Sequence, residues 1–449
     1  MANENLLLKN ANVIDVESGH IVVKNITIES GFITRMENIE EQESSLSIDV
    51  TVLDLQGKWI MPGLIDMHVH IKEGYAPLFT ASGVTTVRNT GGSVDELKDL
   101  IHASMEAPTP RVISADRIID GPPGLWGETS PWNMNADSPE AARKEVRRQV
   151  EAGADLIKVY GWLPKETMEA VVEEAHRYNK DVSCDLIYSK DVTAIDAAKM
   201  GIRWNEHASG IVQDMYPEWT MQADDPVWDS INWEQPDTEK IEKVCKVLIE
   251  NKVIVCPTMV LLDQAKLLEK YWYPVNDVTK KLEDNIGLIN QWKYFLGQPA
   301  SLKSIGRQAT MNKAIAKVYF DLGGQVVAGT DTPAGIFTIP GMALHRELEL
   351  FVEAGISEID TLRAATINAA KALKRSDLGV IKEGAIADIV ILDDNPLENI
   401  QHTQKIYKVI KGGTVYSQKE IFDEIPDEET VTKNSAAFMA AFSAEGNGA

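Results

Sequence analysis

The sequence is poor in cysteine and in positive charge. Its 449 residues include only three cysteines, and none of them has the paired spacing of a CxxC zinc module or of a disulfide framework. Lysine and arginine number 44 against 68 aspartates and glutamates, which leaves a formal net charge of −24. An acidic surface repels phosphate backbones and anionic lipids, so neither nucleic acid nor a membrane is expected as a partner. The scarcity of cysteine favours a reducing compartment.

Long apolar runs are missing as well. No stretch approaches the ~20 apolar residues that a membrane-spanning helix needs. Residues 1–10 lack the basic region and apolar run of a secretory signal. We therefore expect a cytoplasmic protein. With 44% hydrophobic and 25% charged residues, the composition is that of a folded globular protein with a sizeable core.

Two β-rich regions lie near the ends of the chain. Short alternating runs, separated by Gly, Ser and Asn, occupy residues 6–15, 21–29, 32–36, 387–392 and 406–416. Two such regions around one long middle predict a small β-sandwich composed of residues 1–60 and 376–420. The tail, residues 421–449, is acidic and then rich in alanine, and it predicts a docking helix or a loosely held end.

The middle of the chain, residues 61–375, alternates short apolar runs with amphipathic helical stretches. The apolar runs are 63–71, 83–89, 111–115, 154–160, 181–187, 202–207, 253–257 and 325–331. Strands that alternate with helices form parallel sheets, and eight of them predict a closed barrel. The fold class expected is therefore α/β, a (β/α)8 TIM barrel beside a composite β-sandwich.

Two long segments break this rhythm, residues 121–138 after the third run and 210–236 after the sixth. Loops that follow strands lie on the catalytic face of a barrel, and these two are rich in tryptophan. One interpretation is that the indoles line a substrate cleft, and the other is a local hydrophobic cluster that pins a long loop. The tryptophans concerned are Trp126, Trp132, Trp219, Trp228 and Trp233.

The first and last apolar runs end in side chains that bind metals. His68 and His70 lie at positions i and i+2 of the first run, so both imidazoles point to the same side and can reach one ion. Asp331 ends the eighth run, where a buried carboxylate needs a metal or another cation. The alternative for Asp331 is a helix N-cap.

Two further candidates lie on runs four and six. Lys158 stands between Ile157 and Val159, and a lysine on a core strand must be paired, neutral or chemically modified. His207 ends the sixth run. A buried ion pair and a hydrogen-bonded core imidazole are the structural alternatives for these two residues. Barrel enzymes place catalytic groups at strand ends, so the joint pattern on runs one, four, six and eight favours a metal site.

Four motifs resemble the amidohydrolase superfamily, in particular its imidazolonepropionase-like and prolidase-like members. They are PGLIDMHVH at 62–70, GVTTVR at 83–88, ATINAA at 365–370 and GAIADIV at 384–390. The resemblance covers nearly the whole chain. It implies a metal-dependent hydrolase that cleaves an amide-type C–N bond of an N-acyl amino acid, a dipeptide or a cyclic amide. It also implies one or two divalent ions, Zn²⁺ or else Mn²⁺, and a homo-oligomer.

The resemblance also assigns roles to residues. His68, His70 and Asp331 would bind the more buried metal and His207 the outer one, while Lys158, carboxylated by carbon dioxide, would bridge the two. Asp331 would be the catalytic residue, which accepts a proton from the attacking water and passes it to the departing nitrogen. The residues expected to contact the substrate are Tyr160, Arg88, Trp126 and Trp228.

One position departs from the family pattern. Members carry a histidine at the end of strand five, whereas residues 182–187 read VSCDLI and place Asp185 there. Aspartate is a competent zinc ligand, so Asp185 is a further candidate ligand that shifts the preference toward harder ions. Two alternatives stay open. One is a one-metal deaminase or cyclic-amide hydrolase, against which Lys158 argues, and the other is a catalytically impaired relative that binds a ligand without turnover.

Overall fold

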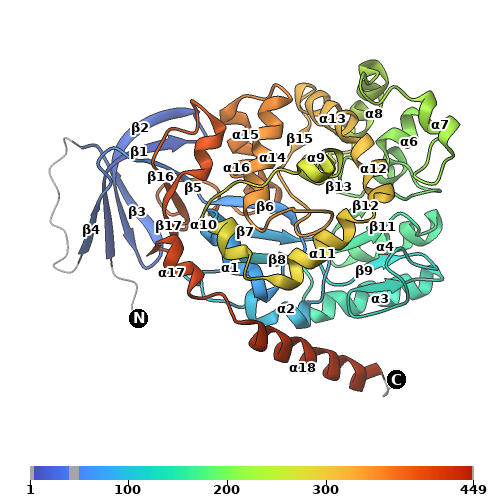
Figure 1. Cartoon of the computed structure of the whole chain (residues 1–449), viewed down its shortest axis with the longest axis horizontal. Coiled ribbons are helices and arrows are strands. Elements are labelled where there is room, and N and C mark those ends of the chain that lie inside the picture. Colours follow the sequence, from blue (N-terminus) through green and yellow to red (C-terminus); the bar gives the residue numbers. More distant parts are fainter. Residues whose placement is uncertain (1–4, 40–49, 447–449) are drawn as a thin grey trace.

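Strands from the two ends of the chain form one mixed sheet in the computed structural model, which describes residues 5–39 and 50–446 (Figure 1). These strands are β1 (Asn5–Asp15), β2 (His20–Glu29), β3 (Phe32–Glu37), β4 (Val50–Asp54), β5 (Trp59–Pro62), β16 (Ile389–Leu392), β17 (Ile406–Lys411) and β18 (Thr414–Tyr416). Their order is β18-β17-β16-β5-β1-β2-β3, with β4 paired to β1. The antiparallel pair of β5 and β16, in which Pro62 lies opposite Ile389, joins the two ends of the chain.

Eight parallel strands form the barrel within the described residues. They are β6 (Leu64–Val69), β7 (Val84–Asn89), β8 (Arg111–Ser114), β11 (Leu156–Tyr160), β12 (Asp181–Asp185), β13 (Trp204–Glu206), β14 (Ile254–Cys256) and β15 (Gln325–Val326). A single bridge between Ala115 and Leu156 connects β8 to β11. A second bridge, between Val69 and Thr332, closes the barrel between β6 and the segment after β15. β6, β7 and β11 are buried along their whole length, as strands covered on both faces must be. The predicted fold class is confirmed, whereas the domain limits at residues 60, 375 and 420 stay predictions.

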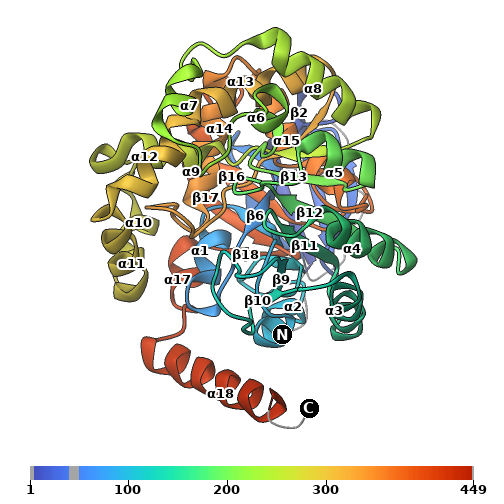
Figure 2. The ribbon, with the colours of Figure 1, turned by 90° about the vertical axis from the view of Figure 1, so that its right-hand side faces the viewer.

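Helices surround these strands (Figure 2). They are η1 (Glu73–Tyr75), α1 (Ala76–Ala81), α2 (Val94–Ile101), α3 (Pro139–Ala152), α4 (Lys165–Arg177), α5 (Ala194–Met200), α6 (Ile211–Met215), α7 (Asp225–Ser230), α8 (Thr238–Glu250), α13 (Ala309–Asp321), α14 (Met342–Glu353), α15 (Glu358–Ala364), α16 (Ile367–Ala372) and η3 (Ile400–Gln404). Local chemistry sets the ends of α3: the Ser138 side chain accepts from the Ala141 amide, and Gly153 takes a left-handed conformation after the last turn.

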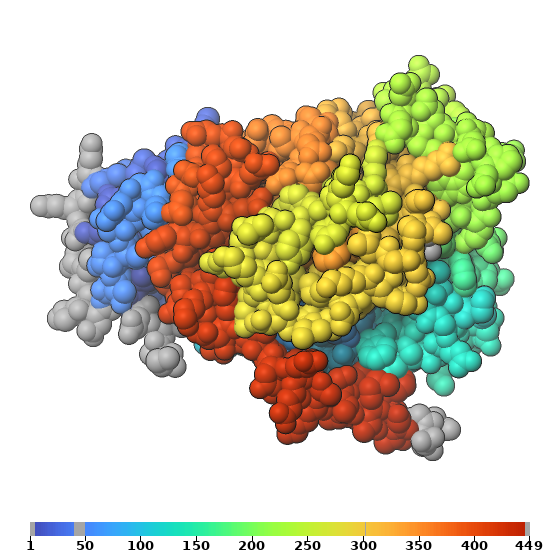
Figure 3. Space-filling model, in the orientation of Figure 1, coloured from blue at the N-terminus to red at the C-terminus, as the bar shows by residue number. Residues whose placement is uncertain are grey.

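The largest departure from the predicted rhythm follows the seventh strand. Between β14 and α13 the chain forms α9 (Met259–Leu267), η2 (Leu268–Lys270), α10 (Asp277–Leu282), α11 (Ile286–Leu296) and α12 (Pro299–Arg307). The sequence predicts one helix over 301–322, but the structure divides this stretch between α12 and α13. Gly306 allows α12 to approach α9, because a Cβ there would lie 2.5 Å from the Lys266 amide nitrogen. This insertion, yellow in Figure 3, crosses one face of the molecule.

Two more segments lie outside the regular alternation. After the third barrel strand, β9 (Ile118–Asp120) and β10 (Asn133–Asn135) extend the sheet beside β11. The tail forms α17 (Gln418–Phe422) and α18 (Glu428–Gly446), and α18 extends along the lower edge of the molecule in Figure 1. Phe438 of α18 packs on Trp132, with ring centroids 6.2 Å apart. None of the helices in the described parts of the chain has the length and apolar character that a membrane crossing requires.

Candidate metal centre

Side chains from strands one and eight meet at the carboxyl end of the barrel. Nε2 of His68 and Nε2 of His70 each lie 3.1 Å from Oδ1 of Asp331. His68 is wholly buried, whereas the His70 side chain is 23% exposed and therefore lies nearer the solvent. Ligand atoms around a four-coordinate zinc lie roughly 3.4 Å apart when each bond is about 2.1 Å. In these three side chains, which we call the inner half of the site, two imidazoles thus lie close to one carboxylate oxygen. The ligand atoms of His68, Asp331 and His207 all lie within 4.8 Å of one another, so His207 is also within reach of a metal held there.

Each imidazole of the site is oriented through its Nδ1 atom. Burial outweighs the nearby carboxylates and lowers the pKa of His68, which keeps the ring in its neutral, metal-binding form. The Nδ1 contacts are His68 to Glu206 Oε2 at 2.7 Å, His70 to the Gly91 carbonyl at 3.0 Å, and His207 to Thr258 Oγ1 at 2.6 Å. An acceptor at Nδ1 fixes the proton there and leaves the Nε2 lone pair free for a metal.

His207 and Asp185 meet beside the inner half. Nε2 of His207 lies 3.3 Å from Oδ2 of Asp185, and the His207 ring centroid lies 4.7 Å from that of His68. Burial disfavours the charged form of both groups, but their mutual attraction lowers the pKa of Asp185 and raises that of His207. Asp185 therefore occupies a position where it can share a cation with His207.

Lys158 completes what we call the outer half of the site, together with His207 and Asp185. Its side chain is fully buried, and Nζ has no hydrogen-bond partner among the described residues. Burial raises the pKa of Asp185, but the charge of His207 and then that of Lys158 lower it. The Lys158 amine is therefore close enough to interact electrostatically with this carboxylate. A buried ammonium without a hydrogen bond is costly. The amine thus fits a group that the polypeptide alone does not supply, such as a carbamate held by metal.

Backbone conformation turns two of these side chains inward. His207 and Asp331 have φ values of 62° and 61°, in the left-handed region that non-glycine residues rarely adopt. Glu206 contacts His68 inside the barrel, so regular alternation would direct the next residue outward. The left-handed turn lets Glu206 and His207 both face the site. Strain of this kind concentrates at functional sites.

Sequence reasoning missed the role of Glu206. Its carboxylate is fully buried and accepts hydrogen bonds from His68, from Arg88 Nη2 at 2.7 Å and from Ser183 Oγ at 2.6 Å. Burial opposes its ionisation, but the Arg88 guanidinium and then His68 hold its pKa well below the usual range. The sequence does place Glu206 next to His207 on a core strand. A carboxylate buried there needs hydrogen-bond or charged partners, which could have indicated its role.

The residues predicted to contact substrate have different surroundings. Tyr160 is buried, and its ring meets that of the exposed Trp126 edge to face at 6.3 Å. Arg88 is buried, donates to Glu206 and to the Met67 carbonyl, and stacks on Trp204. Trp228 is buried among two other indoles, at centroid distances of 5.1 Å and 4.9 Å. The burial of Arg88 and Trp228 does not support their predicted substrate contacts, which stay predictions.

The three buried indoles form the local cluster that was the alternative to a substrate cleft. Trp219, Trp228 and Trp233 are each at most 5% exposed. Trp233 Nε1 donates to the Trp228 carbonyl at 2.9 Å, which satisfies its polar atom. These contacts indicate that the loop after the sixth strand is held by its own apolar side chains.

Comparison with known proteins gives consistent results. The model of the amidohydrolase family matches residues 59–416. Ochratoxinase from Aspergillus niger is 24% identical over 329 residues, which are 69% of this chain and 55% of that protein. Adenine deaminase from Klebsiella pneumoniae is 23% identical over 408 residues, which are 86% of this chain and 53% of its own length. The chain thus spans about half the length of the curated relatives it matches.

Solved structures give the same architecture. The crystal structure of a Xaa-Pro dipeptidase with bound methionine has a TM-score of 0.67 at 21% identity, over 92% of this chain and 99% of that one. The crystal structure of A. niger ochratoxinase has a TM-score of 0.64 at 20% identity, over 92% of this chain and 96% of that one. At these identities the likeness shows the fold.

Proposed function

Because this chain belongs to the amidohydrolase family, we propose that it hydrolyses an amide-type C–N bond of a small molecule with the help of divalent metal. The observation that carries the proposal is the position of Asp331, whose Oδ1 lies 3.1 Å from the Nε2 atoms of both His68 and His70. A carboxylate and two oriented imidazoles at the carboxyl end of a barrel form a metal-binding set. The dipeptidase and ochratoxinase relatives support the same reaction class.

The proposed metal ligands divide between the two halves of the site. His68, His70 and Asp331 hold the inner ion, and His207 and Asp185 hold the outer ion. A divalent cation there supplies a Lewis acid that lowers the pKa of water and polarises a carbonyl oxygen. The proposed ions are Zn²⁺, with Mn²⁺ as the alternative because Asp185 contributes oxygen where imidazole would favour zinc.

Lys158 supplies the bridging group in this proposal. When the neutral Nζ amine adds to carbon dioxide, it forms an N–C bond and releases one proton to solvent, which gives a carbamate anion with two oxygen ligands. The negative charge of the carbamate offsets the charge of the two cations. The carbamate also replaces an ammonium group whose burial without a hydrogen bond would be costly. The absence of any hydrogen bond to Nζ within the described residues supports this assignment over a buried ion pair.

Asp331 is the proposed proton carrier. Burial opposes its ionisation, but His68 and then the other imidazoles hold its pKa well below the usual range, so the carboxylate is charged. Its proposed role as proton acceptor rests on its position beside both His68 and His70. It takes a proton from the water that attacks the substrate carbonyl. It then returns that proton to the departing nitrogen, so one group acts first as base and then as acid.

Tyr160 is the proposed substrate contact. Burial, followed by the charges of Asp185 and Asp331, raises the pKa of its hydroxyl well above the usual value. The hydroxyl therefore keeps its proton and can donate a hydrogen bond to an oxygen of the substrate. Trp126, which is 59% exposed and packs on Tyr160, would cover the ligand from the solvent side.

The test is metal analysis joined to a substrate panel. The full chain, produced with Zn²⁺ or with Mn²⁺, is assayed for bound metal and for cleavage of N-acyl amino acids, dipeptides, lactams and adenine. We expect one or two ions per chain and cleavage of at least one amide. Release of ammonia from adenine without amide cleavage would favour the one-metal deaminase, and bound metal without any turnover would favour the impaired relative.

A homo-oligomeric state and a cytoplasmic location remain part of the proposal. The oligomeric state follows from the family resemblance, and the location follows from the scarcity of cysteine. Light scattering of the purified chain measures the first, and localisation of a tagged chain in cells measures the second.

A further inference from the structure

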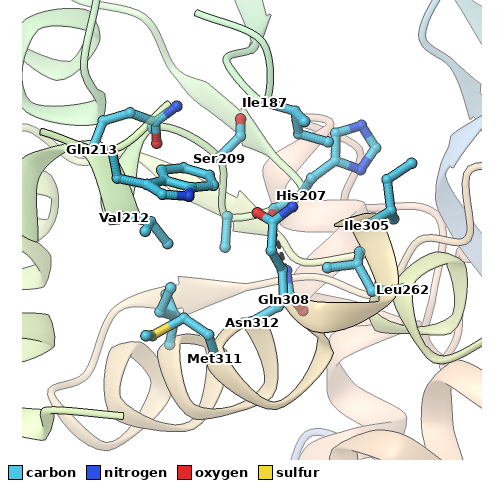
Figure 4. Close-up of a pocket in the computed structure, with 14 residues that line it drawn as sticks. Ile187, His207, Ser209, Val212, Gln213, Leu262, Ile305, Gln308, Met311 and Asn312 are labelled. Atoms are coloured by element: carbon cyan, nitrogen blue, oxygen red, sulfur yellow. Dashed lines mark hydrogen bonds between the residues drawn. The ribbon is translucent and has the colours of Figure 1, made fainter. Parts of the chain in front are cut away.

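A pocket lies against His207, on the side of the segments that follow the fifth to seventh strands. It holds about 420 Å³ of space, including its open mouth. Figure 4 shows Ile187 and His207 on one side and Met311 and Asn312 on the helix opposite. α9 contributes Leu262 to the wall. His207 thus belongs both to the lining of this pocket and to the candidate metal centre.

The lining of this pocket is uncharged apart from His207. Among its described residues there is no lysine, arginine, aspartate or glutamate, although such residues make up 25% of the chain. Most of the wall is apolar, as the side chains of Trp219, Ile305 and Ile315 illustrate. A charged group that entered would lose its hydration and would find no charged partner in the lining other than His207.

Two polar atoms of the lining, Oδ1 of Asn312 and Nε1 of Trp219, have no hydrogen-bond partner among the described residues. Nδ2 of Asn312 donates to the carbonyls of His207 at 2.7 Å and Pro257 at 3.1 Å, which fixes the orientation of the amide. Oδ1 of Asn312 is buried and has no partner among the described residues. A buried acceptor without a donor destabilises the structure, so this oxygen indicates a donor on whatever fills the pocket.

We propose that this pocket binds an uncharged, mainly apolar substituent beside the scissile bond, and that an N–H or O–H of this substituent donates to Asn312. The inference rests on the proposed function, because it assumes that the reacting amide lies at the metal centre. It makes the enzyme selective for substrates with an uncharged group that carries such a donor, tryptophan-like or glutamine-like, ahead of a leucine-like group that lacks one. Substrates that place a lysine, arginine, aspartate or glutamate side chain there are rejected.

The first experiment measures binding without turnover. Calorimetry of the zinc-loaded Asp331→Asn chain compares the N-acetyl amides of leucine, tryptophan, lysine and glutamate. We expect the uncharged probes to bind at least about 100-fold more tightly, since burial of an unpaired charge is costly. N-methylation of the indole should weaken binding about tenfold, because it removes the donor for Asn312. Equal binding of charged and uncharged probes would overturn the proposal.

The second experiment changes the pocket itself. In Ile305→Lys a cation enters the partly exposed rim on α12, and the preference should shift toward the glutamate probe at least about tenfold. Ile286→Lys on α11, where the isoleucine is 59% exposed, is the matched control and should leave the preference unchanged. An unaltered preference in a folded Ile305→Lys chain contradicts the pocket assignment.

The two proposals fail in different ways. Absence of amide cleavage together with a retained preference for uncharged probes would overturn only the proposed function. Cleavage that is equally fast for charged and uncharged substrates, and insensitive to Ile305→Lys, would overturn only the pocket.

Discussion

The two halves of the metal centre are built differently. In the inner half, His68, His70 and Asp331 come from neighbouring parts of the barrel, and Nε2 of each histidine lies 3.1 Å from Oδ1 of Asp331. In the outer half, His207 lies 3.3 Å from Asp185, and Lys158 has no hydrogen-bond partner. In the proposed function, the inner half needs only side chains of this polypeptide. The proposed outer half depends on a lysine modification and on a carboxylate in place of the usual imidazole.

The supports of the two halves differ as well. His68 is held by Glu206, which is itself held by Arg88 and Ser183 in a buried charged network. His207 is held by the neutral hydroxyl of Thr258, which donates in turn to the Pro257 carbonyl. A charged network orients a ligand more firmly than a neutral hydroxyl does. We therefore expect the inner ion to be the more tightly held.

The largest expected effect is on the reaction itself. Asp331→Asn keeps the shape of the side chain but removes the proton acceptor, so kcat should fall about 10²–10⁴-fold, the usual size of a lost acid–base group. Steady-state kinetics and metal content are measured on one sample, because Asp331 is also a proposed ligand. Wild-type turnover with full metal would show that another residue is the base, and Asp185 would then be the next candidate.

The next effect separates the two halves. Lys158→Met keeps the length of the stem but cannot form a carbamate, so the outer ion should bind at least about 100-fold more weakly, more than a residue that only orients a ligand. Metal analysis should then find the inner ion retained. Lys199→Met, at an exposed position on α5, is the matched control. The mass of the native wild-type chain is measured as well. If it shows no added carboxyl group, the bridging role is contradicted.

A smaller effect tests the support of the inner half. Glu206→Gln keeps the size of the side chain but removes the charge that faces His68 and Arg88, so inner-metal affinity should fall about 10–100-fold. Competition with a chelator measures this affinity. The exposed Glu250 of α8 supplies the control, since Glu250→Gln should leave it unchanged. Equal affinity in both variants would mean that Glu206 does not orient His68.

The smallest effect is expected for Asp185→His. This substitution restores the ligand that the family usually carries, and imidazole suits zinc better than carboxylate does. We expect a folded enzyme whose zinc preference over manganese rises by less than about tenfold. Competition between Zn²⁺ and Mn²⁺ gives the ratio. An unchanged ratio, with unchanged activity, would show that Asp185 is not a ligand.

Much of the fold followed from pattern. The eight apolar runs form eight strands, because strand periodicity is a local property of the sequence. The two β-rich ends of the chain pair through β5 and β16. The insertion from α9 to α12 was not predicted, since its short helices lack one long repeating pattern. The tryptophans of the loop after the sixth strand illustrate the same limit, because composition alone allowed both a cleft and a cluster.

The sequence by itself determined which side chains end the barrel strands, because alternation along a strand and the topology of a barrel place strand ends together. On that basis it predicted that His68, His70, Lys158, His207 and Asp331 lie together, with Asp185 at the edge of the site. Only the tertiary structure decided that Glu206 faces His68 and that His207 turns inward through a left-handed residue. Those arrangements, like the uncharged pocket beside His207, depend on contacts between segments distant in sequence. The free energy of such contacts is set by packing and burial, which local sequence pattern does not reveal.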